Sequence, residues 1–190
     1  MKSAVRILGV DDAPFRFGEE KVLVVGAVLR LPHYLEGVMR TECQVDGSDA
    51  DEALEGMLLR SRFREQLKLV LIDGAALGGF NVVDIDRLHA TTGIPMATVT
   101  RDLPDLDKIG SALRKHFPDW ERRLEVISRK RLREVQTEHK PLLVSSIGME
   151  DHEVDMLISR SIVRGAVPEP LRVAHIIASA MARGESRGRA

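Results

Sequence analysis

Short apolar runs alternate along this chain with segments whose apolar residues recur at helical spacing. Three strand candidates come first. Ile7–Val10 and Lys21–Leu31 are apolar runs rich in aliphatic and β-branched residues, and Gly37–Val45 partly alternates apolar and polar residues. The gaps between them are about ten residues or shorter, whereas the crossover that joins parallel strands needs a dozen or more. The pattern therefore predicts an antiparallel meander of three strands.

Helical and strand patterns alternate after Val45. A helix capped by Ser48 or Asp49 is predicted first, because its apolar residues Ala53, Leu54, Met57 and Leu58 fall at helical spacing. The strand "LKLVLIDG" follows, then a helix over about 84–92, the strand "IPMATVT" and a helix that begins near Leu106. This alternation predicts parallel strands added to the meander, and so a mixed sheet with helices on both faces.

The last third of the chain continues the alternation. The segment Trp120–Val135 fits a helix, although "LEVIS" within it fits an edge strand equally well. "KPLLVSSIG" predicts a strand, "EDHEVDMLISRSIVRG" a helix that closes at Gly165, and the residues after "VPEP" a final helix. We see no internal repeat or long linker, so residues 1–190 are predicted to form one α/β domain.

Composition limits the classes of function. The 28 basic and 29 acidic residues nearly cancel, so nucleic-acid binding requires a local basic patch. The single cysteine, Cys43, excludes internal disulfides and cysteine-rich zinc sites, which fits a reducing compartment. No apolar run is long enough to cross a bilayer. We therefore expect a cytoplasmic protein without a membrane partner.

Aspartates stand where predicted strands end. Asp11 ends the first strand, Asp46 and Asp49 follow the third, and Asp73 ends the fourth, whereas Asp12 should point to the opposite side of the first strand. Strands one and four become neighbours once the meander is formed, and ligand sites gather where strand ends meet a change of direction. Clustered carboxylates favour a hard divalent cation such as magnesium or manganese, which suits phosphodiester hydrolysis. The alternative is that these acids are ordinary turn residues.

The order and the residues of several motifs resemble a known family. The chain looks like endonuclease V in successive segments: "ILGVDDAPF", a hydrophobic hairpin, "KLVLIDGAALGG", "TGIPMATVTRD" and "KPLLVSSIGMEDHEVDMLISRSIVRGAVPEPLRVAHIIA". More closely, nearly the whole chain resembles an uncharacterised, largely archaeal family regarded as a relative of endonuclease V. The resemblance implies a ribonuclease H-like fold, a magnesium or manganese cofactor, and a DNA or RNA partner. It also implies a role in DNA repair, through hydrolysis of phosphodiester bonds at deaminated or otherwise modified nucleotides.

The resemblance also implies which residues form the site. Asp11 matches the metal-binding aspartate of the first strand, and Asp73 matches the aspartate of the family's "VDG" motif. The family's third acid is a glutamate after the third strand. Asp46, Asp49, Asp51 or Glu52 could replace it here, and Asp46 and Asp49 are favoured. Asp11, Asp73 and Asp46 are thus the expected metal ligands, with Asp49 the alternative to Asp46.

Further candidates surround these acids. Arg101 falls where the family has a lysine, and its guanidinium could hold phosphate but not donate a proton. His175 falls on the final helix, where the family brings a histidine or acid to the metal, and a structural role is the alternative. Gly74, Gly78 and Gly79 match neither a P-loop nor a dinucleotide-binding fingerprint, so we expect them to let backbone approach nucleic acid beside the site.

Other features leave a second function open. "TECQVDGSDAD" lacks the aromatic and proline-bearing wedge of endonuclease V, and "AALGGFNVVD" replaces the segment that frames its flipped base. The alternative is a catalytically inactive module that keeps the fold and binds nucleic acid or protein.

Two other features carry weaker alternatives. The acidic pair also suggests a phosphoryl-accepting receiver domain, but the short gap between the first two predicted strands disfavours the parallel sheet of that fold. Basic residues in "ERRLEVISRKRLREV" fit either phosphate contact or a solvated helix paired with its own glutamates.

Overall fold

The computed structural model describes residues 5–16, 18–129 and 131–186. Its main sheet has seven strands in the order β3-β2-β1-β4-β7-β9-β8, and β5 and β6 form a separate two-stranded hairpin. The strands are β1 (Arg6–Asp12), β2 (Lys21–Arg30), β3 (Tyr34–Gln44), β4 (Leu67–Asp73), β5 (Ala76–Leu77), β6 (Asn81–Val82), β7 (Met96–Thr100), β8 (Arg133–Val135) and β9 (Leu142–Ile147).

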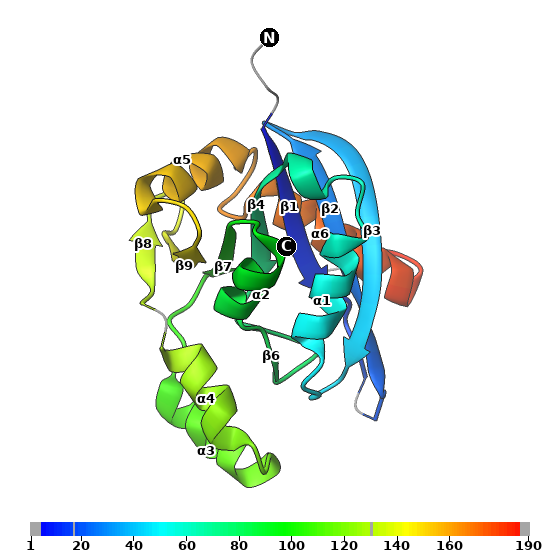
Figure 1. Ribbon diagram of the computed structural model, residues 1–190, viewed down its shortest axis with the longest axis vertical. Helices are drawn as coiled ribbons and strands as arrows, with labels where there is room; N and C mark the ends of the chain where they lie inside the picture. The colour runs from blue at the N-terminus through cyan, green and yellow to red at the C-terminus, as the bar shows by residue number, and fades with distance from the viewer. Residues whose placement is uncertain (1–4, 17, 130, 187–190) are drawn as a thin grey trace.

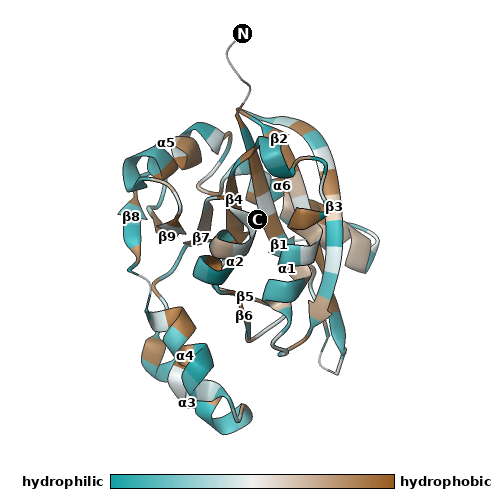
Figure 2. Cartoon of the chain, in the orientation of Figure 1, coloured by the Kyte–Doolittle hydropathy of each residue, from teal (hydrophilic) through white to brown (hydrophobic). Residues whose placement is uncertain are grey.

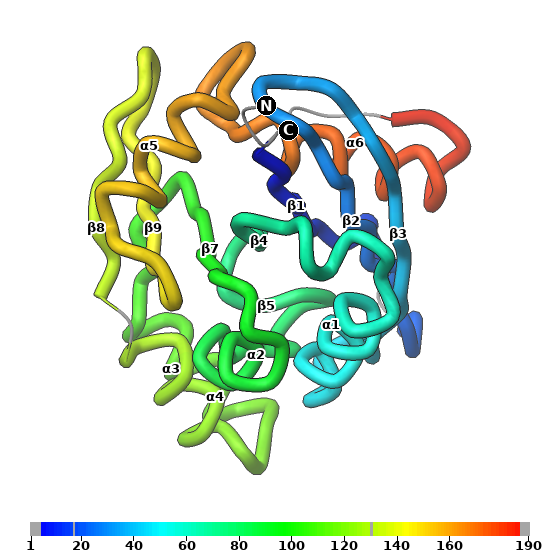
Figure 3. The backbone as a smooth tube through the Cα atoms, turned by 45° about the horizontal axis from the view of Figure 1, so that its top comes forward, coloured from blue at the N-terminus to red at the C-terminus, as the bar shows by residue number. Residues whose placement is uncertain are grey.

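Helices cover both faces of this sheet (Figures 1 and 3). They are α1 (Ala50–Leu59), the 3₁₀ turn η1 (Arg64–Gln66), α2 (Ile85–Thr92), α3 (Leu106–His116), α4 (Trp120–Ser128), α5 (Asp151–Ser161) and α6 (Glu169–Arg183). In the part of the chain that the structure describes, no helix has the length and apolar character needed to cross a membrane.

The strand directions confirm the predicted mixed sheet. β1 and β2 pair antiparallel, as do β2 and β3, while β4 is parallel to β1 and β7 is parallel to β4. β9 departs from the expected parallel addition because it runs antiparallel to β7. The long connection between β7 and β9 contains the α3–α4 helical hairpin and then β8, which pairs antiparallel with β9.

Two boundaries in the last third are sharper than the sequence pattern. "LEVIS" lies in α4, and the edge strand begins only at Arg133, so the ambiguous segment contains both a helix and a strand. α5 ends at Ser161, four residues before the predicted stop at Gly165, because the backbone becomes extended at Ile162.

Alternation along the central strands separates two layers of core. One layer packs against α1 and α2 and includes Leu8, Val10, Val70 and Ile72. The other packs against α5 and α6 and includes Ile7, Leu69, Leu71 and Val99. Figure 2 shows this apolar character concentrated on the central strands. Because side chains alternate between faces, the odd-numbered residues at the ends of β1 and β4 face the α6 layer.

Candidate active site

Asp11 and Asp73 stand side by side at the carboxyl ends of two neighbouring parallel strands. The register pairs Val10 of β1 with Ile72 of β4, so each aspartate is the next residue along its strand. Both share the parity of the core residues that pack under α5 and α6, and Asp11 is only 5% exposed. The predicted meeting of these two strand ends therefore brings two carboxylates to one edge of the sheet.

A glycine in β1 determines how closely α6 approaches this edge. A Cβ added at Gly9 would lie 2.1 Å from the carbonyl carbon of Pro170, so the helix backbone lies directly on the strand. Five residues further along α6, a rise of about 7.5 Å, His175 reaches the level of Asp11, which is about 7 Å along the strand from Gly9. The His175 Nδ1 and the Asp11 Oδ2 are 2.8 Å apart.

Burial and like charge raise the pKa of the Asp11 carboxyl to about 7. Burial is the largest cause, repulsion from Asp73 and then Asp12 adds to it, and the hydrogen bond with His175 opposes it. Burial also raises the pKa of Asp73, while the positive charges of Arg101 and His175 lower it. Arg101 is exposed, and its charge lies within electrostatic reach of Asp73.

The chemistry of these donors fits a hard divalent ion. Magnesium is typically held by one or two carboxylates together with substrate phosphates, rather than by a complete protein cage. The Asp11 and Asp73 carboxylates supply oxygen ligands, and a cation between them would relieve the repulsion that raises the Asp11 pKa. Among the residues that the structure describes, no group of three or more His, Cys, Asp or Glu side chains has metal-binding geometry.

The expected third acid has another set of contacts in this structure. The Phe80 N–H donates to the Asp46 carboxylate at 2.8 Å, and the Asn81 amide donates to Asp49 at 2.7 Å. Asp46 also has a positive φ of 56°, which belongs to the tight turn after β3. Both carboxylates thus join that turn to the β5–β6 hairpin. The acids that perturb the Asp11 pKa are instead Asp73 and Asp12.

The glycine-rich segment after Asp73 folds as the β5–β6 hairpin, which the sequence analysis did not predict. Gly78 and Gly79 form its turn with φ of 56° and 88°, values that a residue with a Cβ rarely adopts. The Gly78 N–H donates to the Asp12 carboxylate at 3.0 Å, so this amide already has an acceptor. Asp12 therefore contacts the hairpin while Asp11 contacts α6. Two glycines between apolar residues are a hairpin signal that could have been recognised.

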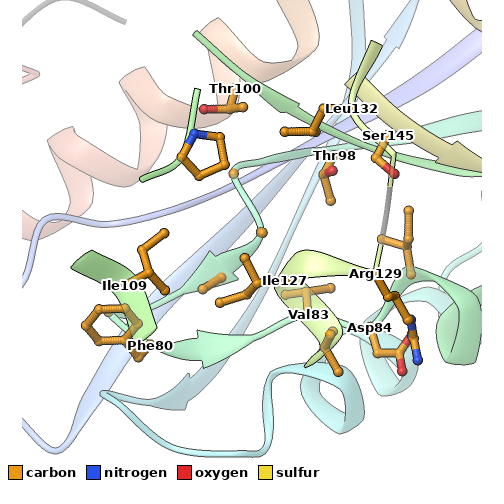
Figure 4. A pocket seen from close by; sticks show the side chains of 17 residues that line it. Phe80, Val83, Asp84, Thr98, Thr100, Ile109, Ile127, Arg129, Leu132 and Ser145 are labelled. Carbon is orange, nitrogen blue, oxygen red and sulfur yellow. The ribbon is translucent and has the colours of Figure 1, made fainter. Parts of the chain in front are cut away.

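A pocket of about 290 Å³ opens at Gly74, immediately after Asp73 (Figure 4). The structure thus places Gly74 and Gly79 in its lining, but not Gly78. Its apolar lining comes from the β5–β6 hairpin and the residue after it, from α2, from the α3–α4 helical hairpin and from the segment before β8, and it includes Phe80, Val83, Ile85, Ile109, Ile127 and Leu132. The volume suits a small group, and the largely apolar lining suits one with apolar faces.

Two hydroxyl side chains meet in the lining of this pocket. Thr98 of β7 and Ser145 of β9 are directly paired in the sheet, and both line the pocket. Ser145 is 2% exposed, yet its hydroxyl has no hydrogen-bond partner among the described residues and is not sealed from the pocket. Neither residue was predicted from the sequence, because both belong to strand segments and carry no motif.

Arginines attach the α3–α4 helical hairpin beside the pocket. Buried Arg123 donates to the backbone carbonyls of Asp46 and Phe80 at 3.1 and 2.7 Å, and stacks over Phe117. Arg129 pairs with Asp84, which caps α2. Arg123 and Arg129, which belong to the basic stretch noted in the sequence, thus have partners within the protein. So does Arg133 of β8, which pairs with Asp151 and Asp155 of α5. Lys130 of that stretch lies outside the described residues.

The fold and the acidic edge define a ribonuclease H-like α/β protein, as the sequence predicted. Human ENDOV shares this fold with a TM-score of 0.62 and 16% identity, covering 96% of this chain and 86% of that one. Endonuclease V of Ciona intestinalis, solved in complex with a 24mer DNA containing an inosine, matches with a TM-score of 0.59 and 13% identity, covering 92% of this chain and 84% of its own.

The chain belongs to the endonuclease dU family, whose model matches residues 3–182. A UPF0215 protein of Methanothermobacter thermautotrophicus is 45% identical over 100% of this chain and 94% of its own length. The crystal structure of a protein of unknown function from Archaeoglobus fulgidus superposes with a TM-score of 0.84 and 36% identity, covering 93% of this chain and 98% of that one. The predicted kinship with an archaeal relative of endonuclease V is confirmed.

Proposed function

We propose that this protein is a divalent-metal-dependent endonuclease that hydrolyses a phosphodiester bond in DNA or RNA at a deaminated or otherwise modified nucleotide. The observation that carries the proposal is the carboxylate pair Asp11 and Asp73, which adjacent parallel strands hold at one buried edge beside a pocket. The name of the endonuclease dU family, the shared fold with endonuclease V and the DNA bound in the Ciona intestinalis structure support a nucleic-acid substrate.

The roles of the residues follow from their positions. Asp11 and Asp73 would hold magnesium or manganese, which when bound supplies the positive charge that activates water and stabilises the reacting phosphate. His175 is a positioning residue, because its hydrogen bond to Asp11 fixes the orientation of that carboxylate. Arg101, exposed beside Asp73, neutralises charge on the phosphate.

The pocket gives the proposed enzyme a place for a base. An enzyme that selects a base in nucleic acid turns it out of the stack and holds it by apolar contact and by hydrogen bonds to its polar edge. The pocket at Gly74 offers apolar walls, and the Thr98 and Ser145 hydroxyls are available for those hydrogen bonds. We assign this pocket to the base adjoining the cleaved phosphodiester.

A binding module without catalysis is the second candidate. One observation favours it: among the described residues, no third acid joins Asp11 and Asp73 in metal-binding geometry. Such a module would bind nucleic acid equally well after metal chelation and after replacement of Asp73 by asparagine.

Nicking assays separate the two candidates. The substrates are single- and double-stranded DNA and RNA oligonucleotides, unmodified or containing one uracil or one inosine, in magnesium or manganese. We expect wild type and the control Asp107→Asn, an exposed carboxylate in α3, to nick a modified strand. Asp11→Asn and Asp73→Asn should lose that activity, while Ser145→Ala should weaken the preference for the modified strand. Equal cleavage by wild type and Asp73→Asn, or none by any protein, would refute the enzyme assignment.

A further inference from the structure

A second cleft begins at the same edge of the sheet and continues away from the acidic pair. Its volume is about 710 Å³, and its lining comes from the β1–β2 loop, the start of β2 and the last turn of α6. Ala13, in this lining, is the second residue after Asp11, so the cleft starts about 7 Å further along the backbone from that residue. Along α6 it extends to Arg183, about 12 Å of helix beyond His175.

Three cationic side chains gather in this cleft. Arg16, Lys21 and Arg183 are all exposed, and none of them pairs with an acid within the described ranges 5–16, 18–129 and 131–186. The acid in the lining is Glu19, which leaves an excess of two positive charges. Arg123, Arg129 and Arg133, in and after α4, differ because they are used in ion pairs and hydrogen bonds.

An aromatic ring accompanies these charges. Phe15 lines the cleft and is 37% exposed, although most large apolar side chains of this protein are buried. A groove of positive charge that also carries an exposed aromatic ring is the arrangement used for single strands, since the cations follow the phosphates while the unpaired bases stack. Paired bases of a duplex are already stacked and leave no face for such a ring.

We propose that this cleft, lined by Phe15, Arg16, Lys21 and Arg183, binds a single-stranded segment of nucleic acid that leads to the Asp11–Asp73 edge. The inference rests on the nucleic-acid partner of the proposed function, but not on cleavage. The proposal assigns contacts with the phosphate backbone of the nucleic acid to the β1–β2 loop and α6, rather than to the basic stretch around α4.

Binding of a short oligothymidylate in EDTA tests the cleft without any nicking. A triple variant, Arg16→Gln, Lys21→Gln and Arg183→Gln, is compared with a charge-matched control, Lys115→Gln, Arg160→Gln and Arg164→Gln, whose residues are exposed elsewhere. We expect the cleft variant to bind about tenfold more weakly at low salt, and the slope of log affinity against log salt to fall by about 2, since each lost phosphate contact removes about 0.7. The control should bind like wild type.

A second variant tests the ring. Phe15→Ala should lower the affinity for oligothymidylate about tenfold, because stacking contributes roughly 1–3 kcal/mol per base, and should leave the affinity for an abasic strand unchanged. Equal binding by wild type and the triple variant, a larger loss for duplex than for single strands, or no binding of oligothymidylate by wild type would overturn the inference. If the cleft variants lose binding but wild type nicks no substrate, the proposed nuclease activity would be refuted while the proposed single-strand cleft would be supported.

Discussion

Replacing Asp11 by asparagine should stabilise the metal-free protein in alkaline solution. Asparagine keeps the size of the side chain and retains an oxygen for the hydrogen bond with His175, but it removes a buried negative charge next to Asp73. The folded-state pKa of Asp11 is raised from 3.8 to about 7, so between these values the folded protein holds a proton that the unfolded chain has released. Stability must therefore fall as the pH rises through this range.

The size of this effect follows from the two pKa values. Each pH unit between 3.8 and about 7 costs the folded state about 1.4 kcal/mol. The raised pKa of Asp11 thus destabilises the folded state by about 4 kcal/mol at pH 8 and about 2 kcal/mol at pH 5. Burial also raises the pKa values of Asp12 and Asp73, which adds to the loss of stability in the same direction.

Urea unfolding in EDTA at pH 5 and pH 8 measures the difference. We expect the gain in unfolding free energy from Asp11→Asn to be about 2 to 3 kcal/mol larger at pH 8 than at pH 5. The exposed-carboxylate control Asp107→Asn should show no such gain. Saturating manganese should then stabilise wild type and not Asp11→Asn, because a ligand stabilises only the folded state that binds it. Equal pH dependence of the unfolding free energy in wild type and Asp11→Asn would refute the interpretation that Asp11 is a buried carboxyl repelled by Asp73.

Three further substitutions test the packing that positions the site, each by urea unfolding. Gly9→Ala should destabilise by at least about 3 kcal/mol, because its Cβ would overlap the Pro170 backbone; a near-neutral result would mean that α6 does not lie on β1 this closely. Arg123→Leu should cost about 2 kcal/mol through two carbonyls left without their donor, and unchanged stability would contradict that contact. Gly56→Ala should instead stabilise α1 by about 0.5–1 kcal/mol, since its Cβ meets only the flexible end of Arg60; a loss of stability would show that the helix cannot accept the methyl group.

The main lines of the fold were predictable because the strongest signals are local. The gaps after β1 and β2 are too short for crossovers, and this determines the antiparallel meander, to which β4 adds as the parallel neighbour of β1. The direction of β9 was not predictable, because an apolar run such as Leu142–Ile147 is the same in either direction. Its orientation depends on where the α3–α4 helical hairpin and β8 return the chain.

Only part of the candidate site, too, was predictable from the sequence. Strand order brings Asp11 and Asp73 together, but it does not show that His175 of α6 contacts Asp11. The hydrogen bonds of Asp46 and Asp49 depend on the β5–β6 hairpin, which has only two residues in each strand and therefore almost no periodicity. A glycine inside a strand often marks close backbone approach, so Gly9 carried information about α6 that the sequence analysis did not use.

The same close approach explains why the acidic pair and the basic cleft share one helix. Because Gly9 admits the start of α6 onto β1, the next turn of the helix meets Asp11 and the last turn reaches the β1–β2 loop. A helix displaced from the strand would move His175 away from Asp11 and Arg183 away from Arg16 together. Gly9→Ala at permissive temperature should therefore weaken both metal-dependent stabilisation and oligothymidylate binding, whereas Arg183→Gln should weaken the second alone.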